Sequence, residues 1–229
     1  MMNQLPTLKL NPIRRGALSG KRHSEQAGFT IIESLAAIIV VTIMLVGITP
    51  MLAIAVATRV QARRVELGTQ AARTYIDHLR SGQLTHPTVS NTPLENAPAP
   101  SGSLSCDGKN GNYCQSPSTL YCVDGDRDNN CTADSINDML VQGVGYNSFS
   151  NDATRGYTLL VRVYRADAFN DGDPLTTDKV QTSFTGGSGN RKAPLVTSTT
   201  EISTGTTRYS DYRCRLNSDD AAKDDFCKQ

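Results

Sequence analysis

The acidic residues of this chain that are best placed to take part in chemistry are a single glutamate and a group of three aspartates. Glu33 lies next to a long apolar run, and Asp124, Asp126 and Asp128 alternate along a segment between two cysteines. A carboxylate at the edge of a membrane helix is costly to bury, so it is expected to have a function. Alternating aspartates can direct several oxygens at one hard cation such as Ca²⁺.

A segment that can span a membrane follows Glu33 directly. Ser34 to Thr58 is a run of 25 residues without a formal charge. At about 1.5 Å of rise per residue, such a helix exceeds the ~30 Å hydrocarbon core of a bilayer. The alternative is a secretory signal peptide, because Ala53-Ile54-Ala55 and Ala55-Val56-Ala57 resemble cleavage sites. The run is, however, about twice as long as the usual apolar region of a signal peptide.

Beyond Thr58 the apolar residues recur at helical spacing, and no break signal intervenes. This pattern predicts an amphipathic helix that ends near Gly82 and is carried by Val60, Leu67, Ala71, Tyr75 and Leu79. We therefore predict one long helix over residues 29–82, with a membrane half at 29–58 and an amphipathic half at 59–82. Residues 83–229 would form a globular domain outside the cytoplasm.

The globular part predicts an α+β fold in which the long helix packs on a small antiparallel sheet. Residues 85–105 are rich in Pro, Ser, Thr and Asn and are expected to form a loop. Asp134–Val144 is expected to be a short helix, with Ile136, Met139, Leu140 and Val144 on one face. The predicted strands are Tyr157–Ala166, Lys179–Phe184 and Leu195–Ser203.

All six cysteines lie in the C-terminal part of the chain, which indicates disulfides formed in an oxidising compartment. A zinc site is the alternative, but there is no C-x-x-C pair and all three histidines precede the cysteines. Six cysteines allow 15 connectivities, so pairing does not follow from the sequence. We predict local pairs that close short loops: Cys106–Cys114, Cys122–Cys131 and Cys214–Cys227.

The acidic segment 122–131 has two interpretations. Asp124, Asp126, Asp128 and Asn130 would be the ligands of a calcium loop, and the spacing begins like that of an EF-hand. The pattern then departs, because Asn129 stands where glycine is expected and Ser135 where a bidentate glutamate is expected. The alternative is a solvated acidic turn closed by a disulfide. We therefore expect that the protein requires no cofactor. Ca²⁺ is the one ion that we consider as a candidate ligand.

Charge and motifs exclude several classes of function. The net charge of +1 gives no sign of a nucleic-acid partner. Residues 1–28 hold five basic residues against one acid, a local net charge of +4, as expected of an end that stays in the cytoplasm. The sequence has no G-x-S-x-G, H-E-x-x-H or phosphate-binding glycine loop, so we do not expect an enzyme.

The segment Gly28-Phe29-Thr30-Ile31-Ile32-Glu33 with the apolar run behind it resembles the cleavage and methylation motif of type IV pilins and type II secretion pseudopilins. The resemblance covers about residues 22–80. It implies that residues 1–28 are a leader, that a prepilin peptidase cuts between Gly28 and Phe29, and that Phe29 is N-methylated. It further implies that Glu33 serves assembly and that Pro50 kinks the helix.

The resemblance also implies partners and a location. The subunit would sit in a bacterial inner membrane as a single-pass protein, with its C-terminal domain in the periplasm. It would then join other pilin or pseudopilin subunits in a pilus or pseudopilus through an assembly platform with a cytoplasmic ATPase. Segments Ala57–Leu67, Tyr121–Asp124 and Gly156–Ala168 are similar to cyanobacterial pseudopilins linked to hormogonium polysaccharide secretion, which implies a role in gliding motility. The rival interpretation is a membrane-anchored or secreted calcium-dependent binding protein that does not polymerise.

Overall fold

A computed structural model describes residues 30–107, 113–177, 190–216 and 227. The fold is α+β, with a mixed sheet of five strands. Three short 3₁₀ helices lie at Leu94–Asn96, Ala153–Arg155 and Ala166–Phe169. The main elements, in chain order, are α1 (Ile31–Arg80), β1 (Val89–Ser90), β2 (Leu120–Val123), β3 (Met139–Tyr146), β4 (Tyr157–Arg165), β5 (Val196–Ile202) and α2 (Tyr209–Leu216).

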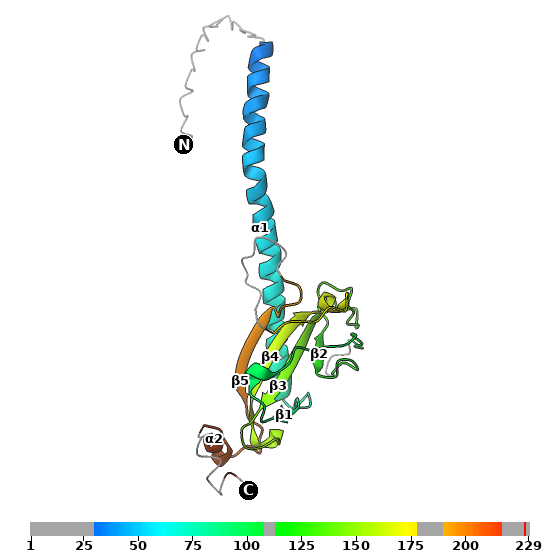
Figure 1. The fold of residues 1–229 in the computed structure, drawn as a ribbon, viewed down its shortest axis with the longest axis vertical. Coiled ribbons are helices and arrows are strands. Elements are labelled where there is room, and N and C mark those ends of the chain that lie inside the picture. Colours follow the sequence, from blue (N-terminus) through cyan, green and yellow to red (C-terminus); the bar gives the residue numbers. More distant parts are fainter. Residues whose placement is uncertain (1–29, 108–112, 178–189, 217–226, 228–229) are drawn as a thin grey trace, which may run out of the picture. The chain divides into compact units, whose positions relative to one another are not determined.

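Helix α1 confirms the predicted long helix and its two kinds of surface. Among the described residues it is the one helix that is long and apolar enough to cross a membrane. The described chain divides between Gly47 and Ile48 into two compact units. In the second unit, the last turns of α1 lie along one face of the sheet (Figure 1). Their buried side is built from small residues and two large ones: Gly68, Ala71, Ala72, Tyr75 and Leu79.

Gly68 has a role in packing, although glycine has a low helix propensity. A Cβ on this residue would lie 3.3 Å from the Cβ of Leu195, just before β5. The absence of a side chain therefore lets α1 approach this part of the sheet closely. The local loss of helix propensity, up to about 1 kcal/mol, accompanies this close contact.

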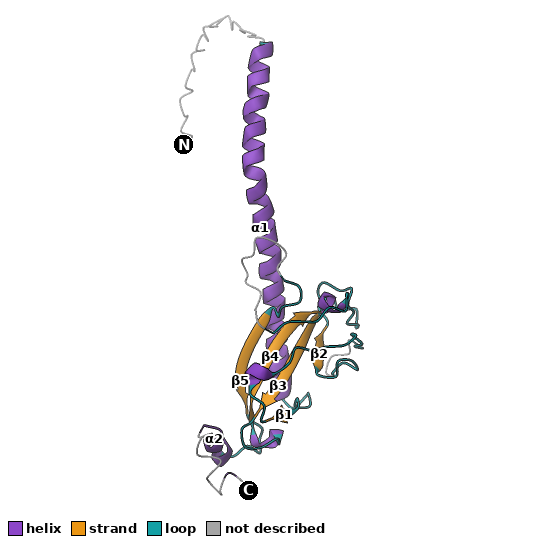
Figure 2. Cartoon of the chain, in the orientation of Figure 1, coloured by secondary structure: helices purple, strands orange, loops and turns teal. Residues whose placement is uncertain are grey.

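The sheet is centred on β3 and β4. Its strand order is β1-β3-β4-β5, and β2 pairs with the first half of β3. The β3–β4 and β4–β5 pairs are antiparallel, with Val141 opposite Val163 and Val161 opposite Ser198 (Figure 2). Among the strands in the described part of the chain, β1 alone pairs in parallel, with Val89 opposite Gly145. The predicted strands Tyr157–Ala166 and Leu195–Ser203 are confirmed as β4 and β5.

The predicted helix Asp134–Val144 is wrong, because β3 begins at Met139 within it. Both faces of β3 are buried, so Met139, Leu140 and Val141 follow one another without the alternation that marks a half-exposed strand. Ile136, placed on the apolar face of that helix, is 57% exposed. The sequence predicted neither strand β2 nor the two-residue strand β1. Strand β1 lies within the predicted loop 85–105. The predicted strand Lys179–Phe184 lies outside the described residues.

The two faces of the sheet are closed in different ways. The face toward α1 carries an aliphatic and aromatic core that includes Tyr75, Val141, Leu159 and Val161. The opposite face is covered by a smaller cluster formed by two disulfides together with Leu120, Leu140 and Ala166. The three disulfides are those predicted: Cys106–Cys114, Cys122–Cys131 and Cys214–Cys227.

Tyr75 joins α1 to the centre of the sheet. Its side chain is fully buried, and its hydroxyl lies 3.0 Å from the hydroxyl of Tyr113. A Cβ on Gly143 of β3 would lie 2.0 Å from the Tyr75 hydroxyl and 2.7 Å from the ring carbon that bears it. Glycine at position 143 is therefore required by the tyrosine that packs over it.

We predict that Gly143→Ala lowers the free energy of unfolding by about 1–3 kcal/mol, because the buried tyrosine must move to admit the methyl group. Gly205→Ala is the matched control, since nothing lies within 4 Å of a Cβ at that exposed position. Thermal unfolding followed by circular dichroism measures both variants. A melting temperature of Gly143→Ala equal to that of the control would contradict the packing described here.

Candidate functional site at the start of helix α1

The first turn of α1 is closed by a side-chain cap. The Thr30 hydroxyl accepts a hydrogen bond from the Glu33 N–H at 3.3 Å, and the Thr30 carbonyl accepts from the same N–H at 3.0 Å. Threonine followed three residues later by glutamate is the spacing of a capping box. The bonded group of Glu33 is its backbone N–H, so the capping side chain is that of Thr30. Sequence reasoning missed this cap, although the T-x-x-E spacing was the available signal.

The Glu33 carboxylate is exposed, and no described residue forms an ion pair with it. It is the one acidic residue in the first turn of the helix, where the helix dipole favours negative charge. The side chains that follow are uncharged as far as Thr58. A single carboxylate thus stands at one end of a long apolar surface, and its counter-charge must come from elsewhere.

That apolar surface is uncovered. Ile31 is 89% exposed and Val46 is 70% exposed, and the large apolar side chains between and after them are also exposed. Large apolar side chains gathered on one exposed surface mark a site for a membrane or for another protein chain. The members of this surface with the largest side chains are Ile31, Ile32, Leu35, Ile38, Ile39, Val40, Val41, Ile43, Met44, Leu45, Val46, Ile48, Met51, Leu52, Ile54, Val56 and Val60.

Three other predicted site residues bear on this helix. Gly28 and Phe29, the predicted cleavage site, lie outside the described residues. Pro50 lies inside α1, where it has no N–H to donate to the carbonyl four residues earlier. The helix continues through this position to Arg80.

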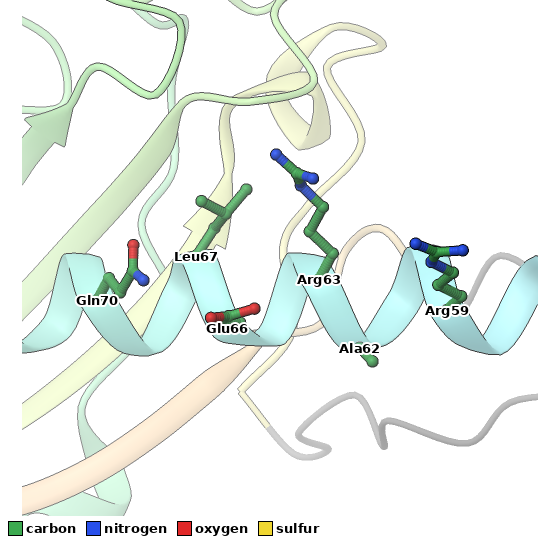
Figure 3. Close-up of a pocket in the computed structure, with 6 residues that line it drawn as sticks. All are labelled: Arg59, Ala62, Arg63, Glu66, Leu67 and Gln70. Atoms are coloured by element: carbon green, nitrogen blue, oxygen red, sulfur yellow. The ribbon is translucent and has the colours of Figure 1, made fainter. Parts of the chain in front are cut away.

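Charged residues return at the end of the apolar surface. Arg59 and Arg63 are one turn apart and, with Glu66 and Gln70, line a groove of about 600 Å³ along α1 (Figure 3). Arginines at this position favour the aqueous side of a membrane boundary, and their long side chains can reach polar headgroups. The polar groove therefore sets the end of the surface that can lie in lipid.

The acidic loop is a second candidate site, and the structure brings three of its four predicted ligands together. One carboxylate oxygen from each of Asp124, Asp126 and Asp128 lies within 4.8 Å of the others. Asn130 donates its backbone N–H to Asp128 at 2.8 Å. These oxygens are the ligand type that Ca²⁺ prefers.

Asp124 holds the loop closed with its own carboxylate. It accepts the backbone N–H groups of Asp126, Arg127 and Asn129 at 3.1, 2.5 and 2.8 Å. Desolvation alone would raise the pKa of the Asp124 carboxyl, but the hydrogen bonds from the N–H groups of Asn129, Arg127 and Asp126 together lower it below its usual value. A cation at this site would have to share the Asp124 oxygens with the backbone.

Asp138 is a supporting residue that sequence reasoning missed. It is 1% exposed and accepts the backbone N–H of Gly125 at 3.1 Å and that of Thr132 at 3.4 Å. Burial raises the pKa of its carboxyl. Asp138 lies within the segment wrongly predicted as a helix, so its direction toward the loop could not be inferred. The loop is thus anchored from beneath by one buried carboxylate.

Comparisons of the chain with protein-family models, with curated proteins and with solved structures gave no match. The function must therefore be argued from the residues and their geometry.

Proposed function

We propose that this protein is a structural subunit, a pseudopilin or minor pilin, of a type IV pilus-like or type II secretion-like machine. The observation that carries the proposal is the single carboxylate of Glu33 at the start of an uncovered apolar helix. The motif Gly28–Glu33 supports processing by a prepilin peptidase. Cleavage between Gly28 and Phe29 would create a new ammonium group on Phe29, which would then be N-methylated.

The chemistry of the helix suits assembly with other subunits of the same kind. In a bundle of such helices, the apolar side chains of each would be covered by its neighbours. The Glu33 carboxylate of one subunit would pair with the Phe29 ammonium of the next. Inside an apolar bundle an unpaired charge is costly, so the pair would favour one axial register over all others.

The surroundings of the helix support a location in the bacterial inner membrane. Residues 1–28 carry a net charge of +4, which favours a cytoplasmic N-terminus and a periplasmic C-terminal domain. The disulfides are consistent with an oxidising compartment on that side. The proposed partners are other subunits, the prepilin peptidase and an assembly platform driven by a cytoplasmic ATPase.

A finer proposal concerns the process that the machine serves. The similarity of three segments to cyanobacterial pseudopilins favours polysaccharide secretion and gliding motility. The role would be structural and would not be that of an enzyme.

We predict that Glu33→Ala leaves membrane insertion intact but lowers incorporation into filaments by at least about 100-fold, because an uncompensated buried charge costs about 3–5 kcal/mol. Glu33→Gln keeps the length of the side chain and the backbone N–H that Thr30 accepts, and it removes only the charge. We expect it to fail like Glu33→Ala. Immunoblots of sheared filaments and of membranes from the native host measure both pools.

Glu66→Ala is the control, since this exposed glutamate lies on the same helix beyond the apolar surface. It should assemble like the wild type. Normal incorporation of Glu33→Gln would mean that assembly does not need the charge, and the proposed ion pair would be wrong.

A second candidate function is calcium-dependent binding by a membrane-anchored or secreted protein that does not polymerise. The convergence of Asp124, Asp126 and Asp128 favours it.

For this candidate, isothermal titration of the full chain in phosphatidylcholine nanodiscs with CaCl₂ should give a dissociation constant of roughly 0.1–1 mM, as in extracellular calcium modules. Asp126→Ala and Asp128→Ala should each abolish the heat of binding. Asp77→Ala, which removes an exposed aspartate from α1, should not change it. Absence of binding heat in the wild type would exclude the calcium site.

A further inference from the structure

The sheet has a gap on one edge of its central strand. Strand β2 pairs with β3 as far as Leu120 opposite Gln142, and β1 pairs with β3 from Val89 opposite Gly145. Gly143 and Val144 lie between the two pairings. A cavity of about 410 Å³ opens at this gap and is bounded by the segment after α1 and by the approach to β2.

Backbone groups of β3 face this gap. The N–H of Gly145 donates to the Thr88 carbonyl, and the N–H of Asn147 donates to the Ser90 carbonyl, both on the side away from β4. Polar groups of alternate residues in a strand point to the same side. Gly143 lies two residues before Gly145 and four before Asn147, so its N–H and C=O point to the same side as theirs. That side is the gap between β1 and β2.

The walls of the cavity are held in place by hydrogen bonds. The Tyr113 hydroxyl donates to the Thr85 carbonyl at 2.9 Å, and the Gln142 side-chain amide donates to the Pro98 carbonyl at 2.9 Å. His86 directs Nδ1 to the Tyr157 hydroxyl at 2.8 Å. The cavity is thus a formed feature of the fold, with its loops tied to α1, β3 and β4.

The lining is uncharged and combines polar groups with apolar surface. None of the described residues that form it is Lys, Arg, Asp or Glu. Burial lowers the pKa of His86, which keeps the imidazole neutral near pH 7. Most of the side chains that remain are hydroxyls, which can both donate and accept, beside apolar Pro87, Pro98 and Val144. The hydroxyl groups belong to Thr85, Thr88, Ser90, Ser118 and Thr119, and to Tyr113, whose proton is donated to the Thr85 carbonyl.

We propose that this cavity binds a neutral, hydroxyl-rich ligand, the chemical class of a sugar unit. A charged ligand would lose its hydration without meeting an opposite charge, which is unfavourable. An apolar ligand would leave the hydroxyl and backbone groups without partners, which is also unfavourable. The volume lies within the range of about 300–1,000 Å³ that small-molecule sites occupy. The proposal does not depend on polymerisation of the chain, so either one can fail while the other holds.

Saturation-transfer NMR of the full chain in phosphatidylcholine nanodiscs tests this site. The probes are glucose, galactose and N-acetylglucosamine at up to about 10 mM, which detects dissociation constants near 1 mM. Glucuronate and glucosamine are the charged counterparts. We expect transfer to at least one neutral sugar and at least tenfold less transfer to its charged counterpart.

Thr119→Trp should abolish this transfer, because the indole of an exposed rim residue would fill the cavity. Thr88→Trp, from the opposite wall, is a second blocking variant if the first does not fold. Thr199→Trp places the same side chain at an exposed position of β5, outside the cavity, and should bind like the wild type. No transfer to any neutral sugar, equal transfer in folded blocking variants, or stronger binding of a charged probe would overturn the proposal.

Discussion

An apolar helix surface that the described chain leaves uncovered is the constraint on which the rest of the structure depends. Each large aliphatic side chain on this surface gains about 1.5–3 kcal/mol when it is removed from water. A lipid bilayer and a bundle of similar helices both provide that environment, so the apolar residues alone would discriminate little between them. In the proposed function Glu33 would supply the discrimination, because its carboxylate is costly in lipid but would be paired in a bundle. In the proposed function, that difference favours assembled subunits in correct register.

The same helix also serves as a core element of the second unit. Gly68, Ala71 and Ala72 allow α1 to approach the sheet, and Tyr75 reaches over Gly143 at its centre. The opposite face of the sheet has little aliphatic material, and two disulfides take its place. These cross-links hold together the irregular loops that lie on this face. The gap beside Gly143 follows from this construction, because β1 and β2 cover β3 only in part.

Much of this architecture could be predicted from the sequence, and the failures have physical causes. The 25 uncharged residues after Glu33 and the helical spacing up to Leu79 are local signals, and so is the alternation in β4. Strand β3 has no such signal, since burial on both faces removes its alternation and makes Met139–Val144 look like part of a helix. The disulfide pairs were predicted from short separations, whereas the role of Asp138 depends on where the acidic loop folds. The cavity beside Gly143 arises from strand register, which no local pattern in the sequence specifies.

The most direct test of the central claim is mass spectrometry of the N-terminus of the protein recovered from membranes of its native host. The proposed function predicts a mature chain that begins at Phe29 and carries an N-methyl group. A chain that begins after Ala55 or Ala57 would show ordinary secretion and would remove the proposed assembly role of Glu33 together with the membrane helix. A chain that still begins at Met1 or Met2 would contradict processing and leave a plain membrane anchor.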